Sequence, residues 1–103
     1  MAMSKLTVLA VCGSGVVSSS MIAQKIKDVL SSLAVEVDVI ELLPTSVEEY
    51  VQRGNIDFIV TTSPIPGDIN VPIIKGIALM TGFGEETVVE EIMSTAREVI
   101  SQE

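Results

Sequence analysis

The chain has 103 residues, of which 48% are hydrophobic, so we expect residues 1–103 to form one domain with a buried core. Six basic and 14 acidic residues give a net charge of −8, which argues against a nucleic acid or an anionic membrane surface as partner. The sequence contains no histidine and one cysteine, Cys12, which excludes a catalytic imidazole, an intramolecular disulfide and a multi-cysteine zinc site. We therefore expect no metal site and no cofactor.

The uncharged stretch from Leu6 to Gln24 has the length of a membrane span but not its composition. Glycines and serines interrupt it, whereas a spanning helix needs about 20 mainly apolar residues. The apolar run 6–11 before Cys12 faintly resembles a lipoprotein signal, but it is shorter than the apolar region of ~7–15 residues that a signal peptide needs. We expect a cytoplasmic protein without direct membrane insertion, in a compartment where a thiol stays reduced.

Hydrophobic patterns in the first part of the chain predict a strand, a helix and a second strand. Residues 6–11 form an apolar, β-branched run typical of a buried central strand. The apolar residues of 21–33 recur with helical spacing, so we expect this helix to turn Met21 inward and to begin at a capping serine among residues 18–20. Residues 35–40 alternate apolar and acidic, which indicates a strand that is exposed on one face or at an edge.

The middle of the chain predicts a short helix, a strand and a loop. Ser46 and Glu49 have the spacing of a capping box, so we expect a short helix to start there and to end at Gly54. Residues 56–61 predict a third strand, and the proline and glycine content of residues 62–68 predicts a loop.

The last third predicts a short strand and a long helix. Residues 71–74 form the fourth strand, and the pattern allows residues 76–80 to continue it after a bend. Two glycines at 82 and 84 then lead into a helix with polar residues on its outer side and an inward face made of Val88, Val89, Ile92, Met93, Ala96, Val99 and Ile100.

The order β-α-β-α-β-β-α with short connections predicts an α/β fold. We expect a small four-stranded parallel sheet flanked by helices, as in Rossmann-like three-layer sandwiches. Ligands on such sheets bind outside the carboxyl ends of the strands, which points to the loops 12–18, 41–46 and 62–70.

The segment that follows the first strand has the composition of a phosphate cradle. Glycines permit a tight turn, and the next helix offers unpaired N–H groups and the positive end of its dipole. We expect a phosphate-binding loop made of Gly13, Ser14, Gly15, Val16, Val17, Ser18 and Ser19. The same dipole would lower the pKa of the Cys12 thiol. The alternative is that Cys12 is a buried, structural thiol at the end of a strand and that the serines are ordinary loop and helix-capping residues.

The spacing after Cys12 resembles that of thiol phosphatases of the low-molecular-weight tyrosine phosphatase type, with one departure. Those enzymes place an arginine six residues after the cysteine, and this chain has Ser18 there. An arginine would clamp the phosphoryl oxygens in the transition state. A cysteine loop without it is expected to hold a phosphoryl group and to hydrolyse it slowly, which suits a carrier.

Two stretches carry a resemblance to a known family. Residues 6–21, with the strand, Cys12, the glycines and the serines, and residues 70–84, with a short strand and a glycine-containing turn, resemble the enzyme IIB components of the bacterial phosphoenolpyruvate-dependent sugar phosphotransferase system. The chain looks most like the galactitol-type IIB group, and length and element order also agree.

The resemblance implies a function and two partners. A phosphohistidine on a IIA protein would donate its phosphoryl group to Cys12, which would pass it to a galactitol-like polyol or another sugar bound by the IIC membrane permease. The loop 62–68 would then lie beside Cys12 and contribute Thr62, Ser63 and an exposed Ile65 to the docking surface for these partners; the alternative is an ordinary connection.

Two other functions remain open. One is a cysteine-dependent phosphatase or reductase, against which the missing arginine and the missing second cysteine argue. The other is a non-enzymatic, anion-binding regulatory α/β module in which Cys12 is structural.

Overall fold

The computed structural model describes residues 5–13, 16–33, 36–67 and 69–101, except the side chains of residues 16–20 and Met80. The strands form one parallel sheet in the order β2-β1-β3-β4, which confirms the predicted α/β fold. Short 3-10 turns cover Ser31–Leu33 and Pro44–Ser46, and the other elements in chain order are β1 (Lys5–Val11), α1 (Val16–Leu30), β2 (Glu36–Leu42), α2 (Val47–Arg53), β3 (Phe58–Thr61), β4 (Ile73–Lys75), α3 (Ile77–Thr81) and α4 (Glu85–Ser101).

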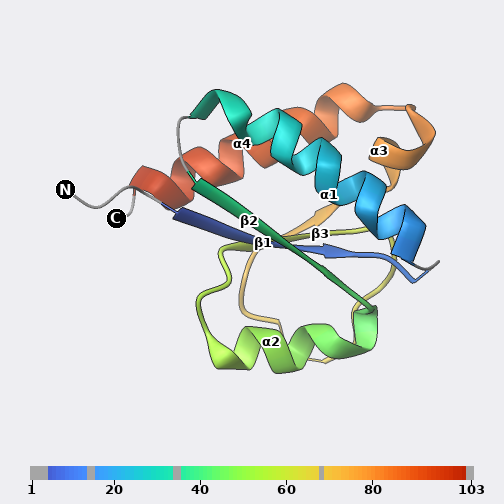
Figure 1. Cartoon of the computed structure of the whole chain (residues 1–103), viewed down its shortest axis with the longest axis vertical. Helices are drawn as coiled ribbons and strands as arrows, with labels where there is room; N and C mark the ends of the chain where they lie inside the picture. The colour runs from blue at the N-terminus through green and yellow to red at the C-terminus, as the bar shows by residue number, and fades with distance from the viewer. Residues whose placement is uncertain (1–4, 14–15, 34–35, 68, 102–103) are drawn as a thin grey trace.

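Helices cover both faces of the sheet. α1, α3 and α4 lie on one face and α2 lies on the other (Figure 1). The side chains of β1 alternate between two hydrophobic clusters: Leu6, Val8 and Ala10 pack on the side of α1 and α4, and Leu9 and Val11 pack on the side of α2. β3 and the second half of β1 are buried on both faces, and both strands are mainly apolar, as central strands of parallel sheets are. The polar residues lie at the strand ends: Lys5 and Thr7 near the start of β1 and Thr61 at the end of β3.

β2 is an edge strand, as its alternating pattern predicted. Its Glu36 and Asp38 side chains are exposed. The Asp38 carboxylate accepts a hydrogen bond from Lys5 Nζ on β1 at 3.0 Å, and this bond, with a smaller effect of the Glu36 charge, raises the pKa of Lys5.

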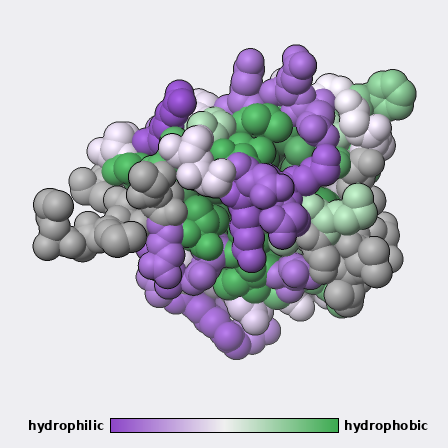
Figure 2. All heavy atoms as spheres, turned by 45° about the horizontal axis from the view of Figure 1, so that its top comes forward, coloured by the Kyte–Doolittle hydropathy of each residue, from purple (hydrophilic) through white to green (hydrophobic). Residues whose placement is uncertain are grey.

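The outer side of the two long helices is polar. Figure 2 views the face formed by α1 and α4 and shows hydrophilic side chains projecting from it, with hydrophobic atoms between and below them. The prediction that the polar residues of these helices face solvent is confirmed for Gln24, Lys27, Asp28, Glu90, Glu91, Arg97 and Glu98.

The start of α1 differs from the prediction. The helix begins at Val16, so residues 18–20 lie inside its first turns and none of them is the N-cap. α1 contains no glycine or proline, so no helix-breaking residue after Gly15 delays its start. Met21, predicted to face the core, is 48% exposed.

The predicted capping box of α2 is wrong. Ser46 makes no capping hydrogen bond through its side chain, because it closes the 3-10 turn and already has helical angles, φ −95° and ψ −8°, whereas a capping residue is extended. Glu49 instead accepts a hydrogen bond from Arg53 at 2.8 Å. Gly54 ends the helix as predicted, with a φ of 85°.

Residues 77–81 form the helix α3 and do not continue β4. Gly76 is buried directly against β3: its N–H donates to the Thr61 carbonyl at 2.7 Å, and a Cβ there would lie 2.5 Å from Val60 Cγ1. The chain turns at this glycine, and Ala78 and Leu79 then enter the core from a helix. Both residues belong to the cluster on the side of α1 and α4, which a helical turn allows, whereas a strand would point adjacent residues to opposite faces of the sheet.

A side chain fixes the register of β1 and β3 at the entry to β3. The Thr7 N–H donates to Asp57 Oδ2 at 2.7 Å, and the Asp57 N–H donates to the Thr7 carbonyl at 2.8 Å. Asp57 thus satisfies the β1 backbone one residue before β3 begins.

We expect Asp57→Ala to lower the free energy of unfolding by about 1–2 kcal/mol, because the Thr7 N–H loses its acceptor. Asp57→Asn keeps an acceptor oxygen and should lose less. Urea denaturation checks both variants, with the exposed Glu90→Ala as control. An Asp57→Ala variant as stable as the original chain would show that this bond does not hold the register.

Candidate functional site

The loops after β1, β2 and β3 meet at the carboxyl edge of the sheet, as predicted. Val11 at the end of β1 is in register with Leu42 of β2 and Thr61 of β3. Hydrogen bonds continue past the strand ends: the Cys12 N–H donates to the Leu42 carbonyl at 3.3 Å, and the Thr62 N–H donates to the Val11 carbonyl at 3.1 Å. These bonds bring residues 12–13 beside the loop that starts at residue 62.

Cys12 lies at the boundary between this edge and the core. It is the first residue after β1, and it belongs to the hydrophobic cluster on the side of α1 and α4. Only 1% of its surface is exposed. The thiol therefore has the burial that a structural cysteine would have, together with a position at the strand end where a parallel sheet binds ligands.

The predicted phosphate-binding loop is shorter than expected. Ser14 and Gly15 lie outside the described residues, and the predicted loop residues 16–19 form the first turn of α1. No acidic residue occupies that turn, so no carboxylate opposes the positive end of the helix dipole. The backbone N–H groups of the first turn of a helix have no partner within the helix, and here they lie at the edge that carries Cys12.

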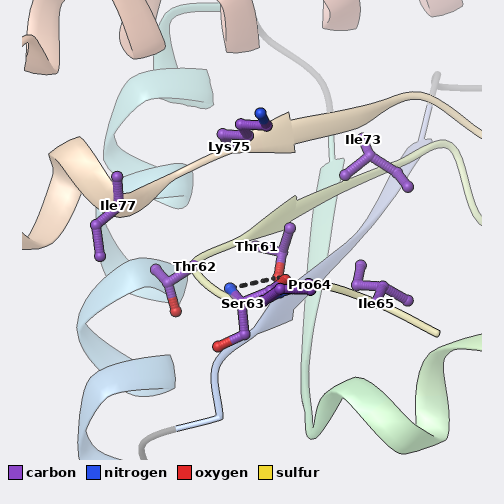
Figure 3. A pocket seen from close by; sticks show the side chains of 8 residues that line it. All are labelled: Thr61, Thr62, Ser63, Pro64, Ile65, Ile73, Lys75 and Ile77. Carbon is purple, nitrogen blue, oxygen red and sulfur yellow. Dashed lines mark hydrogen bonds between the residues drawn. The ribbon is translucent and has the colours of Figure 1, made fainter.

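Ser63 is the residue of the neighbouring loop that contacts the cysteine loop. Its Oγ accepts a hydrogen bond from the Gly13 N–H at 3.1 Å. Thr61 at the end of β3 holds Ser63 from the other side: Thr61 Oγ1 donates to the Ser63 carbonyl at 2.7 Å and accepts from the Ser63 N–H at 3.1 Å. In Figure 3 the Ser63 hydroxyl points toward the chain segment that leaves β1.

Sequence reasoning placed Ser63 in a docking loop and did not pair it with Gly13. The turn from Thr61 to Ser63 did have a sequence signal, because threonine and serine side chains often bond to the backbone two residues further along the chain. The contact with Gly13 itself joins residues 50 positions apart and has no local signal.

A pocket of about 420 Å³ opens beside Ser63, on the side of the sheet that faces α2. It is largely apolar, with Lys75 as its charged residue, and is lined by Thr61, Thr62, Ser63, Pro64, Ile65, Ile73, Lys75 and Ile77. The prediction of an exposed Ile65 is wrong, because Ile65 is half-buried against the smaller hydrophobic cluster. The large hydrophobic side chains that the pocket exposes are Ile73 and Ile77, at 43% and 52%.

The first 27 residues contain three lysines and no acidic residue, but these lysines do not gather at the site. Lys5 begins β1, at the opposite edge of the sheet, and pairs with Asp38. Lys25 forms an ion pair with Glu85 of α4 at 2.9 Å, and Lys27 lies in the last turn of α1. Affinity for an anion at the cysteine loop would therefore come from backbone N–H groups and the helix dipole.

Across the described ranges, no group of three or more cysteine, aspartate or glutamate side chains is placed to hold a metal ion. No helix among these residues has the length and apolar character to cross a membrane.

The sequence profile of one family, described as "PTS system, Lactose/Cellobiose specific IIB subunit", matches residues 7–98. A putative phosphotransferase enzyme IIB component of Escherichia coli strain K12, SgcB, is 26% identical over 85 residues, which are 82% of this chain and 90% of that protein. The galactitol-specific EIIB components of Escherichia coli O157:H7 and Shigella flexneri are each 25% identical over 91 residues, or 87% of this chain and 95% of theirs. Because the family profile covers most of β1, the other three strands and nearly all of α4, the chain belongs to this family of phosphotransferase-system IIB subunits.

Proposed function

We propose that this IIB subunit carries a phosphoryl group on Cys12, between a IIA phosphohistidine and a polyol or sugar bound by a IIC permease. The observation that carries the proposal is the position of Cys12. It stands between the carboxyl end of β1 and the amino end of α1, where backbone N–H groups and the helix dipole favour an anion. The family of the chain supports a phosphotransferase, and Cys12 is the sole cysteine in the sequence.

Both transfer steps exchange one bond to phosphorus for another. In the first, Cys12 Sγ attacks the phosphorus of the IIA phosphohistidine, the P–N bond breaks and the S–P bond forms. The thiol proton ends on the released imidazole. In the second, a hydroxyl oxygen of the polyol attacks the same phosphorus, the S–P bond breaks, and its electron pair returns to sulfur as a thiolate while the hydroxyl proton goes to solvent or to a base of the permease.

The residues around Cys12 support transfer over hydrolysis. The position six residues after the cysteine, occupied by arginine in the phosphatases discussed above, is Ser18 in the first turn of α1. Lys75 lines the neighbouring pocket, and its side chain points away from Ser63 in Figure 3. A loop built from backbone donors stabilises the phosphoryl group in its ground state without the bidentate clamp that speeds attack by water.

The family and the relatives support the proposed partners and substrate. A IIA protein would donate the phosphoryl group and a IIC permease would present the acceptor, with the IIB subunit acting in the cytoplasm at the inner face of the membrane. Galactitol is the first polyol to test, because two of the relatives described above are galactitol-specific. The loop residues Thr62, Ser63 and Ile65, with the apolar pocket beside them, are the proposed docking surface.

Burial of Cys12 sets a condition on this mechanism. A phosphorus atom cannot reach a sulfur whose residue is 1% exposed. Transfer therefore requires the thiol to become more accessible than it is in this structure, and we expect docking of the IIA protein to expose it. The same burial is the observation that favours a structural cysteine, so accessibility decides between the two.

Phosphorylation of Cys12 is tested directly by intact mass. The protein is incubated with phosphoenolpyruvate, the general phosphotransferase proteins and a cognate IIA protein. We expect one phosphoryl adduct, located on Cys12 by peptide fragmentation, that disappears in Cys12→Ser and on addition of a IIC permease with galactitol.

The other outcomes identify other functions. Absence of an adduct with a competent IIA protein would overturn the proposal. Turnover of an aryl phosphate that Cys12→Ser abolishes would favour a phosphatase-like enzyme. Anion binding that survives Cys12→Ser, without transfer, would favour a regulatory module.

Accessibility of the thiol is tested by alkylation with iodoacetamide. We expect Cys12 to react much more slowly in the folded protein than in urea, because the thiolate must reach the reagent. Addition of a IIA variant that lacks its phosphorylatable histidine should raise the rate if docking opens the site. A thiol that reacts equally fast in folded and unfolded protein would contradict the burial, and no acceleration by any IIA protein would contradict opening on docking.

A further inference from the structure

We propose that Ser63 is a positioning residue for the cysteine loop: its hydroxyl holds the Gly13 N–H and so fixes where the chain goes after Cys12. The inference rests on the proposed function, since it concerns transfer to Cys12. It assigns to Ser63 a role in orienting the site that is separate from docking of a partner.

The geometry places an oxygen at the first backbone donor after the cysteine. Ser63 Oγ accepts from the Gly13 N–H at 3.1 Å. A serine hydroxyl has two acceptor sites and one donor, so accepting this bond leaves the O–H able to donate to an anion held at the loop. Ser63 therefore suits a site that alternates between an empty and a phosphorylated state.

Ser63 is itself held in place by the end of β3. Thr61 makes two hydrogen bonds to the backbone of Ser63, at 2.7 Å and 3.1 Å. Thr61 is 6% exposed and is the one buried polar side chain among those that the structure describes. A buried polar side chain requires hydrogen-bond partners, and both hydrogen bonds of the Thr61 hydroxyl go to the Ser63 backbone and orient it.

Gly13 is matched to this contact. A Cβ on residue 13 would lie 3.0 Å from Ser63 Oγ and 3.7 Å from Ser63 Cβ. A larger residue at this position would push the hydroxyl away from the N–H. The glycine therefore permits the close approach of the two loops.

The contact adds little to the stability of the fold. The two loops are already joined by the Thr62 N–H bond to the Val11 carbonyl, and the Ser63–Gly13 bond is exposed to solvent. Loss of an exposed bond changes stability slightly, because water replaces the partner. A role in positioning and a role in folding thus predict different measurements.

The main test compares Ser63→Ala with Ser63→Thr, which keeps the hydroxyl. Single-turnover transfer from phosphorylated IIA protein to Cys12 is followed by rapid quench at increasing IIA concentration. We expect Ser63→Ala to lower the transfer rate constant at saturating IIA concentration about 3- to 10-fold, the effect of losing one hydrogen bond. A loss of docking through Ser63 would be measured separately, as a higher half-saturating concentration. Ser63→Thr should restore the rate, and Ser94→Ala, on the exposed side of α4, serves as control.

Two further readouts follow the contact itself. The ¹H–¹⁵N signal of Gly13 should shift and its amide should exchange faster in Ser63→Ala, whereas Ser63→Thr should leave both close to the original values. Gly13→Ala should slow transfer, and adding Ser63→Ala to it should slow transfer no further, because both changes break one contact.

The outcomes separate this inference from the proposed function. If the original chain is phosphorylated and Ser63→Ala transfers at the same rate, the positioning role is wrong and the carrier function stands. If Ser63→Ala changes only the half-saturating concentration, Ser63 docks the partner and the inference is overturned. If the original chain accepts no phosphoryl group, the proposed function fails and the inference fails with it, whatever the Gly13 signal shows.

Discussion

The pairing of β1 with β3 is the constraint on which the site depends. Four residue pairs, from Val8 with Phe58 to Val11 with Thr61, set the register, and Asp57 secures it at the amino end. Because the register is fixed, the chain leaving β1 and the chain leaving β3 emerge side by side. Cys12, Gly13 and Ser63 then come together as a consequence of strand pairing rather than of any local preference.

The hydrophobic patterns of the strands predicted their places in the sheet well. The apolar runs of β1 and β3 predicted central strands, and the alternation of apolar and acidic residues in β2 predicted an edge strand. Prediction failed where a neighbour in space decides the conformation. Gly76 turns the chain into α3 because Val60 leaves no room for a side chain, and the turn that precedes α2 removes the cap expected at Ser46. The position of Cys12 was predictable from a strand followed by glycines, whereas its burial depends on the packing of α1 and α3 over the sheet.

Cys12 joins two environments with opposite effects. Apolar surroundings disfavour a charged thiolate, and the amino end of a helix favours it. A doubly charged phosphoryl group on sulfur would be costly inside the cluster that holds Ala10 and Ile22, and well solvated by N–H groups at the loop. The state of the sulfur and the arrangement of the loop are therefore expected to be coupled, and the hydroxyl of Ser63 bonds to Gly13, the residue directly after the cysteine.

The separation of Gly13 and Ser63 by 50 residues has a consequence for folding. Closing a segment of that length costs conformational entropy before any contact across it is gained, so β1–β3 pairing belongs to the slower steps of assembly. The hydrogen bonds of α1 are local, whereas the edge proposed to bind a phosphoryl group does not exist until β3 has joined β1. A newly made chain therefore exposes the Cys12 thiol until β1 and β3 have paired, and the burial of the thiol is a product of these later folding steps.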